Sequence, residues 1–320
     1  MIDLLHIINN PDYDTQYFLG TTGNTAAGSY QDYQTWKKPA NCTWVYMLCV
    51  GGGASGATSL VGTAVGCYGG MGGATAQETT LIIPAMFLPD ILYVQCGMGA
   101  IPNTYSSSTV GSLTMAGLPS YVSIEPSTVQ SNNTIVIYSG GGPASLTVSN
   151  TTAGGTGPAA TNSSIALMNL AGRGQFITIP NIIGAAGANG AASSTGGLIQ
   201  VGGMGGAGIG GSGLTGAMAI NPGPGLLLQQ FGLGWDFVGQ NPQVGAGSNG
   251  NNGAISSRFL MNFGGWGGAS ANSTQGSGIG GGGGAGSPGC GGGGCGASTS
   301  GTATPIPGTG GPGFVLIISF

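Results

Sequence analysis

The sequence predicts a mostly irregular, all-β protein: a bundle of polyglycine II helices framed by short β-strands, with very little α-helix. The first observation is composition, because 71 of the 320 residues are glycine, about three times ordinary usage. The second is spacing within Gly184–Gly216, where glycine occupies positions 184, 187 and 190 and returns in the same phase at 196, 202, 205, 208 and 211. A period of three belongs to an extended left-handed helix of the polyproline II type, and neither an α-helix nor a β-strand has it.

Low charge supports an ordered glycine-rich fold. The chain carries 4 basic and 8 acidic residues and has a positive mean hydropathy of +0.26, whereas disordered chains combine high charge with low hydrophobicity. Collagen is disfavoured, because the glycine phase breaks repeatedly and the chain has only 17 prolines. Glycine has no side chain to bury and loses the most backbone entropy on folding. Lateral packing of glycine helices would offset that loss through dense hydrogen bonding and close backbone contact.

Short runs of β-branched and aromatic residues predict strands between the glycine blocks. The predicted strands are Thr43–Val50, Thr79–Ile83, Ile91–Cys96, Tyr121–Glu125, Thr134–Tyr138 and the apolar run that ends at Phe320. Several of them run directly into glycine, as at Gly51, Gly97 and Gly140. We expect the last strand to pair beside Trp44–Val50 and close the fold.

Two regions are predicted: an N-terminal docking segment, residues 1–35, and a glycine-rich polyglycine II domain, residues 36–320. The first region is ordinary in composition and reads as a short irregular or β segment. Its aromatic residues are candidates for attachment to another chain: Tyr13, Tyr17, Phe18, Tyr30 and Tyr33. The alternative is a peripheral flap that covers the glycine core.

The six cysteines are expected to be small buried thiols. They are Cys42, Cys49, Cys67, Cys96, Cys290 and Cys295. The spacing of Cys290 and Cys295 does not fit the short zinc-binding motif, and no histidine lies nearby. A disulfide between Cys290 and Cys295 remains the alternative.

Several functional classes are excluded or disfavoured by the residues. The chain lacks the basic stripe of a nucleic-acid-binding protein, and no apolar run reaches the length of a membrane span. The start of the chain carries Asp3 and no basic region, unlike a secretory signal. His6 is the single histidine, and no nucleophile–histidine pair can be built with it. We therefore expect no enzymatic activity, no cofactor and no metal.

Two aromatic excursions interrupt the glycine pattern, at residues 219–244 and 255–266, and they hold the candidate binding residues. Aromatic faces with a few polar groups suit sugar or protein surfaces. The receptor- or partner-binding candidates are Phe231, Trp235, Asp236, Phe237, Arg258, Phe259 and Trp266. Alternatively these side chains cap the glycine helices or pack between subunits, and Asp236 pairs with Arg258.

Three motifs, in order along the chain, resemble the glycine-rich domains of tailed-phage fibres. Trp36-x-x-Pro39-Ala40, followed by Val45–Val50 and three glycines, is similar to the first strand of such domains. The second motif is Pro89, Val94 and Gly97-x-Gly99, and the third is the ending Gly310-Gly-Pro-Gly-Phe-Val-Leu-Ile. The resemblance covers roughly residues 30–320.

The resemblance implies a phage virion structural protein located on the tail fibre or particle surface. Adhesins of this class fold as a sandwich of polyglycine II helices whose variable loops at one end bind host receptors. The expected partners are other virion proteins and a host surface glycan or protein. A homo-oligomer is expected, with a trimer by analogy to phage fibres. This chain lacks the long attachment or coiled-coil region of the larger fibre proteins, so we expect a separate small component.

Two other functions stay open at the level of sequence. One is a non-adhesive capsid or tail decoration that stabilises the particle. The other is a glycine-rich ice-binding protein, in which a segment such as Gly184–Gly216 presents a flat face of small residues.

Overall fold

The protein is described by a computed structural model. It describes residues 14–20, 22–23, 33–58, 70, 72–103, 115–126, 134–144, 163–164, 177–182, 255–256, 261–262, 285–286, 288–295 and 306–320. Within these residues the one helical element is the short 3-10 helix η1, Ala85–Phe87. Antiparallel β-sheets make up most of the regular structure. The expectation of a mostly β and irregular fold with very little helix is confirmed for this part of the chain.

The first sheet brings together strands from both ends of the chain. Its order is β1 (Asp14–Leu19), β14 (Phe314–Ser319), β4 (Trp44–Val50), β5 (Glu78–Pro84) and β11 (Ile177–Ile182), and all neighbours are antiparallel. Strand β14 lies beside β4, with Leu316 opposite Leu48. The predicted closure of the fold by the C-terminal strand is therefore confirmed.

The second sheet is built from the middle of the described chain, with β3 joining at its edge. Its order is β10 (Ser163–Ser164), β9 (Ile135–Ser139), β8 (Ser120–Ser123), β6 (Ile91–Gln95) and β3 (Gln34–Lys37). Two short pairs complete the described strands: β2 (Thr22–Gly23) with β7 (Gly99–Ala100), and β12 (Ile255–Ser256) with β13 (Met261–Asn262).

The two sheets pack face to face as a β-sandwich. One hydrophobic cluster joins them, with Met47 and Leu81 from the first sheet and Val94 and Ile137 from the second. The opposite face of the first sheet is also apolar and buried. It carries Tyr46, Leu48, Val50, Ile82, Phe314, Leu316 and Ile318. Burial on both faces explains why β4 and β14 read as continuous apolar runs instead of alternating ones.

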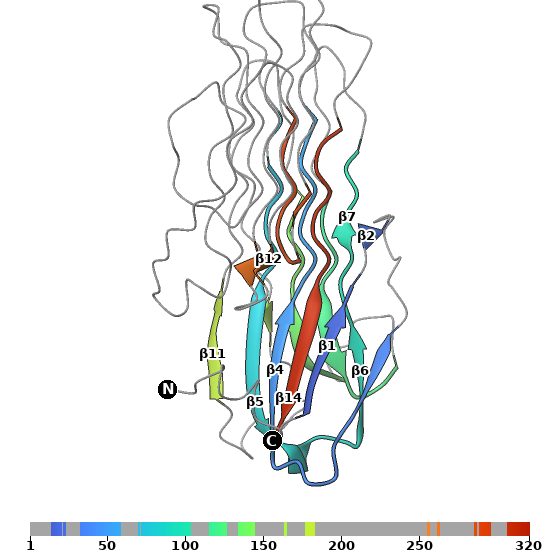
Figure 1. Cartoon of the computed structure of the whole chain (residues 1–320), viewed down its shortest axis with the longest axis vertical. Helices are drawn as coiled ribbons and strands as arrows, with labels where there is room; N and C mark the ends of the chain where they lie inside the picture. The colour runs from blue at the N-terminus through green and yellow to red at the C-terminus, as the bar shows by residue number, and fades with distance from the viewer. Residues whose placement is uncertain are drawn as a thin grey trace, which may run out of the picture.

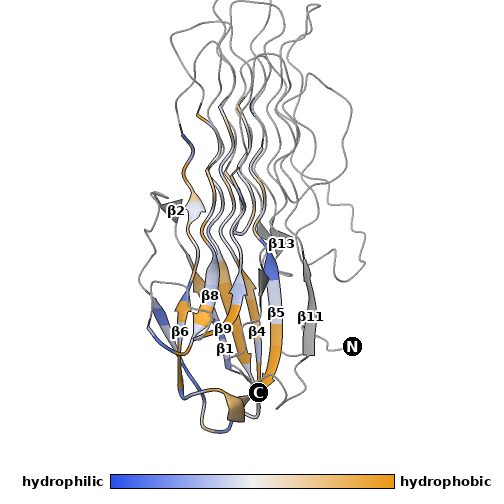
Figure 2. Cartoon of the chain, turned by 180° about the vertical axis from the view of Figure 1, so that it is seen from behind, coloured by the Kyte–Doolittle hydropathy of each residue, from blue (hydrophilic) through white to orange (hydrophobic). Residues whose placement is uncertain are grey.

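Glycine segments continue from one end of the sandwich as extended chain, which makes the described part elongated (Figure 1). We call this the lattice end, and the end that carries η1 and Phe320 the base. Figure 2 shows hydrophobic residues concentrated in the sheets, whereas the extended segments are mostly pale. Strand β4 runs from the base to the lattice end and passes directly into residues 51–58.

Residues 51–58 form the centre of the lattice, and we call them the hub. Six consecutive hub N–H groups donate hydrogen bonds of 2.8–3.3 Å to three neighbouring segments in strict rotation. The bonds join Gly51 to Gln77 and Ala54 to Ala74, Gly52 to Leu118 and Ser55 to Met115, and Gly53 to Gly311 and Gly56 to Gly308. Every third donor of the hub therefore serves the same neighbour.

Hub carbonyl groups accept from three further segments. The donors are Gly142 to Gly52, Ala100 to Gly53, and Gly292 to Ala54. Six segments thus bond directly to the hub, and we call them the ring. They are residues 72–77, 97–103, 115–119, 140–144, 288–295 and 306–313.

The ring segments also bond to one another and close a complete circle around the hub. The closing hydrogen bonds run from Gly73 to Gly292, Gly308 to Gly293, Gly310 to Ala100, Leu118 to Met98, Gly117 to Gly142 and Gln77 to Gly140. Segments that run away from the sandwich alternate around the ring with segments that return to it. Most residues of the hub and ring are buried. Buried backbone N–H and C=O groups need hydrogen-bond partners, and the bonds between these segments provide them.

Glycine is required in the lattice because backbones approach too closely for a side chain. A Cβ atom at Gly53 would overlap the carbonyl oxygen of Cys290, and one at Gly56 would overlap that of Gly293. The obstacle in each case is backbone, which cannot rotate away as a side chain could. Gly289 is a separate case, since its φ of 76° lies in the left-handed region.

Serine hydroxyls fix the junction between sandwich and lattice. Ser120 Oγ accepts from the Gly97 N–H at 2.8 Å and donates to the Val50 carbonyl at 2.6 Å. Ser139 Oγ donates to the carbonyl of Gln77. These bonds link the root of one ring segment to strand β4, and strand β9 to the root of another ring segment.

Some features differ from the sequence-based expectation or lie beyond it. Strand β11 is not among the strands predicted from the sequence. It holds Pro180 and shows a register shift between Ile179 and Ile182, which an edge strand can accommodate. The segment Gly184–Gly216 lies outside the described residues.

Candidate functional site

The base of the sandwich holds a pocket of about 680 Å³. It lies between the turn that connects β3 to β4 and the helix η1. Its lining consists of Lys37, Lys38, Pro39, Ala40, Cys42, Ala85, Met86 and Asp90. The turn is held in place by backbone bonds from Ala85 to Thr43 and from Thr43 to Phe320.

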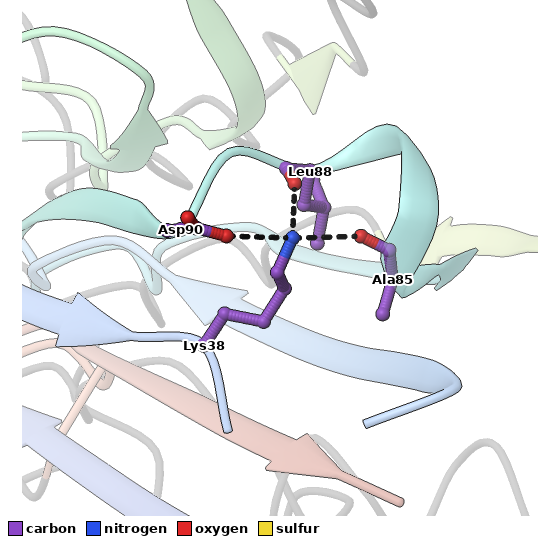
Figure 3. Close-up of polar contacts among 4 residues, drawn as sticks. All are labelled: Lys38, Ala85, Leu88 and Asp90. Atoms are coloured by element: carbon purple, nitrogen blue, oxygen red, sulfur yellow. Dashed lines mark hydrogen bonds and ion pairs between the residues drawn. The ribbon is translucent and has the colours of Figure 1, made fainter. Parts of the chain in front are cut away.

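Lys38 organises one wall of this pocket (Figure 3). Its ammonium group donates to the carbonyl of Leu88 at 2.7 Å and to that of Ala85 at 3.4 Å. It also lies 3.1 Å from a carboxylate oxygen of Asp90. Lys38 is one-fifth exposed and Asp90 almost fully exposed, so the carbonyl contacts fix the lysine and the ion pair faces water.

The pocket offers binding contacts. Lys37 presents an exposed ammonium group, and Met86 is 82% exposed, the largest exposure among the described apolar side chains. Trp44 and Ile91 are also partly exposed near this end. Exposed methionine and tryptophan side chains suit contact with another protein, because both residue types are enriched in protein interfaces. The adjacent Lys37 and Lys38 are the available sequence signal for this pocket, and in the fibre-like motif they occupy the two unspecified positions between Trp36 and Pro39.

The proposed attachment residues are separated by the fold. Tyr17 is 45% exposed and its ring packs 5.3 Å from that of Phe314. Phe18 points the other way and lies in the core between the sheets. Tyr33 is exposed and makes an edge-to-face contact with Tyr93 at 5.2 Å. Tyr13 and Tyr30 lie outside the described residues.

The receptor-binding candidates also lie outside the described residues. This applies to every one of them: Phe231, Trp235, Asp236, Phe237, Arg258, Phe259 and Trp266. The proposed pairing of Asp236 with Arg258 stays a prediction for the same reason.

None of the five described cysteines forms a disulfide. Cys290 and Cys295 are fully buried, as expected for structural thiols, and the alternative disulfide between them is not formed. Burial raises the pKa of Cys96 to about 12, so its thiol stays protonated at neutral pH. Cys42 differs from the expectation of burial, since it is partly exposed in the base pocket. Cys67 lies outside the described residues.

Glu78 is a buried carboxyl group at the lattice end of the first sheet. It is 1% exposed, and neither of its carboxyl oxygens has a hydrogen-bond partner. Burial raises its pKa to about 8. A carboxyl group in these surroundings is protonated at neutral pH. No sequence pattern indicated this, because the residue preceding a β-branched run is usually placed at an exposed strand end.

Within the described ranges, no group of three or more histidine, cysteine or acidic side chains could hold a metal ion. The same part of the chain contains no helix with the length and apolar character needed to cross a membrane. Comparison with known proteins found no matching family model and no matching curated protein.

Proposed function

We propose that the hub and ring segments are polyglycine II helices. The observation that carries this is the rotation of hub hydrogen bonds among neighbours with a period of three. Three residues per turn is the repeat of that helix, and six neighbours around one segment is the hexagonal arrangement that such a repeat favours. Circular dichroism with polyproline II character and little helix is expected, and a strongly helical spectrum would refute it.

On this basis we propose that the protein is a non-enzymatic phage virion structural protein on the tail fibre or particle surface. The support is the combination of a closed glycine lattice with the three fibre-like motifs. All three motifs have a place in the described structure, because Val45–Val50 leads into the hub while Gly97–Gly99 and Gly310–Gly313 belong to the ring. Immunogold labelling of purified particles with an antibody to this chain tests the location.

We further propose that this protein is a receptor-binding component. It would bind a host surface glycan or protein through the aromatic excursions at residues 219–244 and 255–266. The hub leads away from the base, and ring segment 72–77 leads back into strand β5. We assign the base, at the opposite end of the sandwich from this lattice, to contact with other virion proteins. Copies of the chain are expected to assemble as a homo-oligomer, with a trimer as the expected state. Adsorption of purified protein to host cells, and competition with infection, are the expected results.

The alternative is a decoration protein that stabilises the particle without binding a receptor. The described lattice supports the decoration role as well as the receptor-binding role, because close backbone packing makes the protein rigid in both cases. Labelled particles together with no adsorption of the purified protein would establish this alternative. A further alternative is an ice-binding role, and the absence of ice shaping in solution would exclude it.

A further inference from the structure

Glu78 occupies the point where the first sheet meets the glycine lattice. It is the first residue of β5, directly after Gln77, whose backbone bonds to both hub and ring. The Gln77 carbonyl accepts from Gly51 of the hub, and the Gln77 N–H donates to Gly140 of the ring. Ala76, one residue earlier, donates to Gly289. Any movement of Glu78 therefore acts on the bonds that attach one ring segment to its neighbours.

Among the described residues, none beside Glu78 compensates for a negative charge. Its pairing partner in β4 is Val50, which lies opposite Phe314 of β14. The titratable groups on this face of the described sheet are Tyr46 of β4 and, in the adjoining apolar cluster, Cys290. Neither is a cation, and the pKa of Tyr46 is raised by its burial and, to a smaller extent, by Glu78 itself. Strand β11 pairs with β5 here through Ile182 and contains no titratable residue type.

The basic side chains of the described part lie too far away to help. Lys37 and Lys38 are at the base. Strand β5 spans seven residues from Glu78 to Pro84, which places the base roughly 20 Å from the carboxyl group. With the neighbours that the structure describes, burial favours the neutral, protonated form of the carboxyl group.

We propose that Glu78 is a proton-dependent latch, which holds the junction between β5 and ring segment 72–77 closed while protonated and opens it on losing its proton. The sign follows from linkage. Because the folded state raises the pKa of Glu78 from 4.5 to about 8, the stabilisation is complete below pH 4.5. It is lost progressively as the pH rises towards 8. Between these limits the equilibrium constant for opening rises about tenfold per pH unit, and above pH 8 it levels off.

Carboxyl-carbon NMR tests the latch in the intact protein. The chain has two glutamates, Glu78 and Glu125, so protein labelled with ¹³C in glutamate gives two signals. The variant Glu125→Gln, at an exposed position, assigns them. We expect the Glu78 signal to titrate with a midpoint near 8. A midpoint near 4.5 overturns the proposal, and this measurement needs no substitution at Glu78.

Hydrogen exchange tests whether ionisation opens the junction. Protection factors, corrected for the intrinsic pH dependence, are measured for the N–H groups of Gly51, Ala76 and Gln77 between pH 6 and 9. In the wild-type protein and in Glu125→Gln, protection should fall about tenfold per pH unit up to pH 8. In Glu78→Gln it should be independent of pH. Equal slopes in the wild-type protein and Glu78→Gln, or a pH-independent loss of protection in Glu78→Gln, would contradict the latch.

Discussion

The sandwich and the lattice solve the same folding problem by different means. The sandwich buries large apolar side chains such as Met47, Leu81 and Ile137 between two sheets. The hub and ring have few large side chains and instead pair their backbone groups, and the hub bonds to six neighbours at once. The stability of the sandwich should therefore fall when side-chain volume is lost, and that of the lattice when any atom is added.

The largest effect is expected from Gly53→Ala in the hub. The new Cβ would overlap the carbonyl oxygen of Cys290, which belongs to a ring segment held on several sides. Since backbone must move, we expect destabilisation of more than about 4 kcal/mol, at the extreme of single substitutions, and loss of folded protein. Thermal or chemical unfolding measures it.

The neighbouring substitution Ala54→Gly is the matched control for Gly53→Ala. It changes the same segment but removes a methyl group instead of adding one, and should cost roughly 1 kcal/mol. Similar stabilities for the two variants would mean that the hub is not packed as tightly as described.

In the sandwich, Leu81→Ala should destabilise the protein by about 2–5 kcal/mol. Leu81 is fully buried between the sheets, and truncation leaves a cavity in addition to the lost apolar contact. Unlike Gly53→Ala, this variant should still fold. The control Leu81→Met keeps the volume and should cost less than about 1.5 kcal/mol, and a greater loss for Met than for Ala would contradict a side-chain-packed core.

Ser120→Ala should weaken the junction between the two regions by about 1–3 kcal/mol. The hydroxyl bridges the Gly97 N–H and the Val50 carbonyl in a buried position, and both backbone groups would lose this partner. Chemical unfolding gives the size of the loss. Ser123→Ala is the control, because the Ser123 hydroxyl makes one local bond to the Glu125 carbonyl. An equal loss of stability in Ser123→Ala would mean that the Ser120 bridge contributes no more than a single local hydrogen bond.

The smallest effect is expected at the base, from Asp90→Asn. Asp90 is exposed and its ion pair with Lys38 is screened by water, so the loss should be at most about 1 kcal/mol. Lys38→Met should cost more, because the Ala85 and Leu88 carbonyls lose a donor. Unfolding at low and high salt measures both, and a larger loss for Asp90→Asn would reverse the ranking of these contacts.

Sequence reasoning located the strands with strong β-branched and apolar runs. Thr43–Val50 was expected and β4 spans Trp44–Val50, while Thr79–Ile83 was expected and β5 spans Glu78–Pro84. These segments can be recognised as strands from their own residues, because burial on both faces requires a continuous run of apolar and β-branched side chains. Strands β3 and β11 have weaker signals, since they lie at sheet edges.

The neighbours of each glycine segment could not be predicted from sequence. A run of glycine with alanine or serine is compatible with any partner of the same kind, so Gly53 carries no mark that identifies Gly311 as its acceptor. The isolation of Glu78 was equally hidden, because it depends on strands brought from distant parts of the chain. The aromatic excursions, with Trp235 and Trp266, stay a prediction.

The period of three in the hub has a consequence for how the chain finds its fold. If one segment slides by three residues along its neighbour, every third donor again meets an acceptor, so the lattice alone does not define its own phase. The sheets do define it, because a slide of three residues, like any odd number, exchanges the side chains on the two faces of a strand and disrupts their packing. The sandwich therefore works as the template that sets the alignment of the glycine segments, and lattice length can change most readily in steps of three residues.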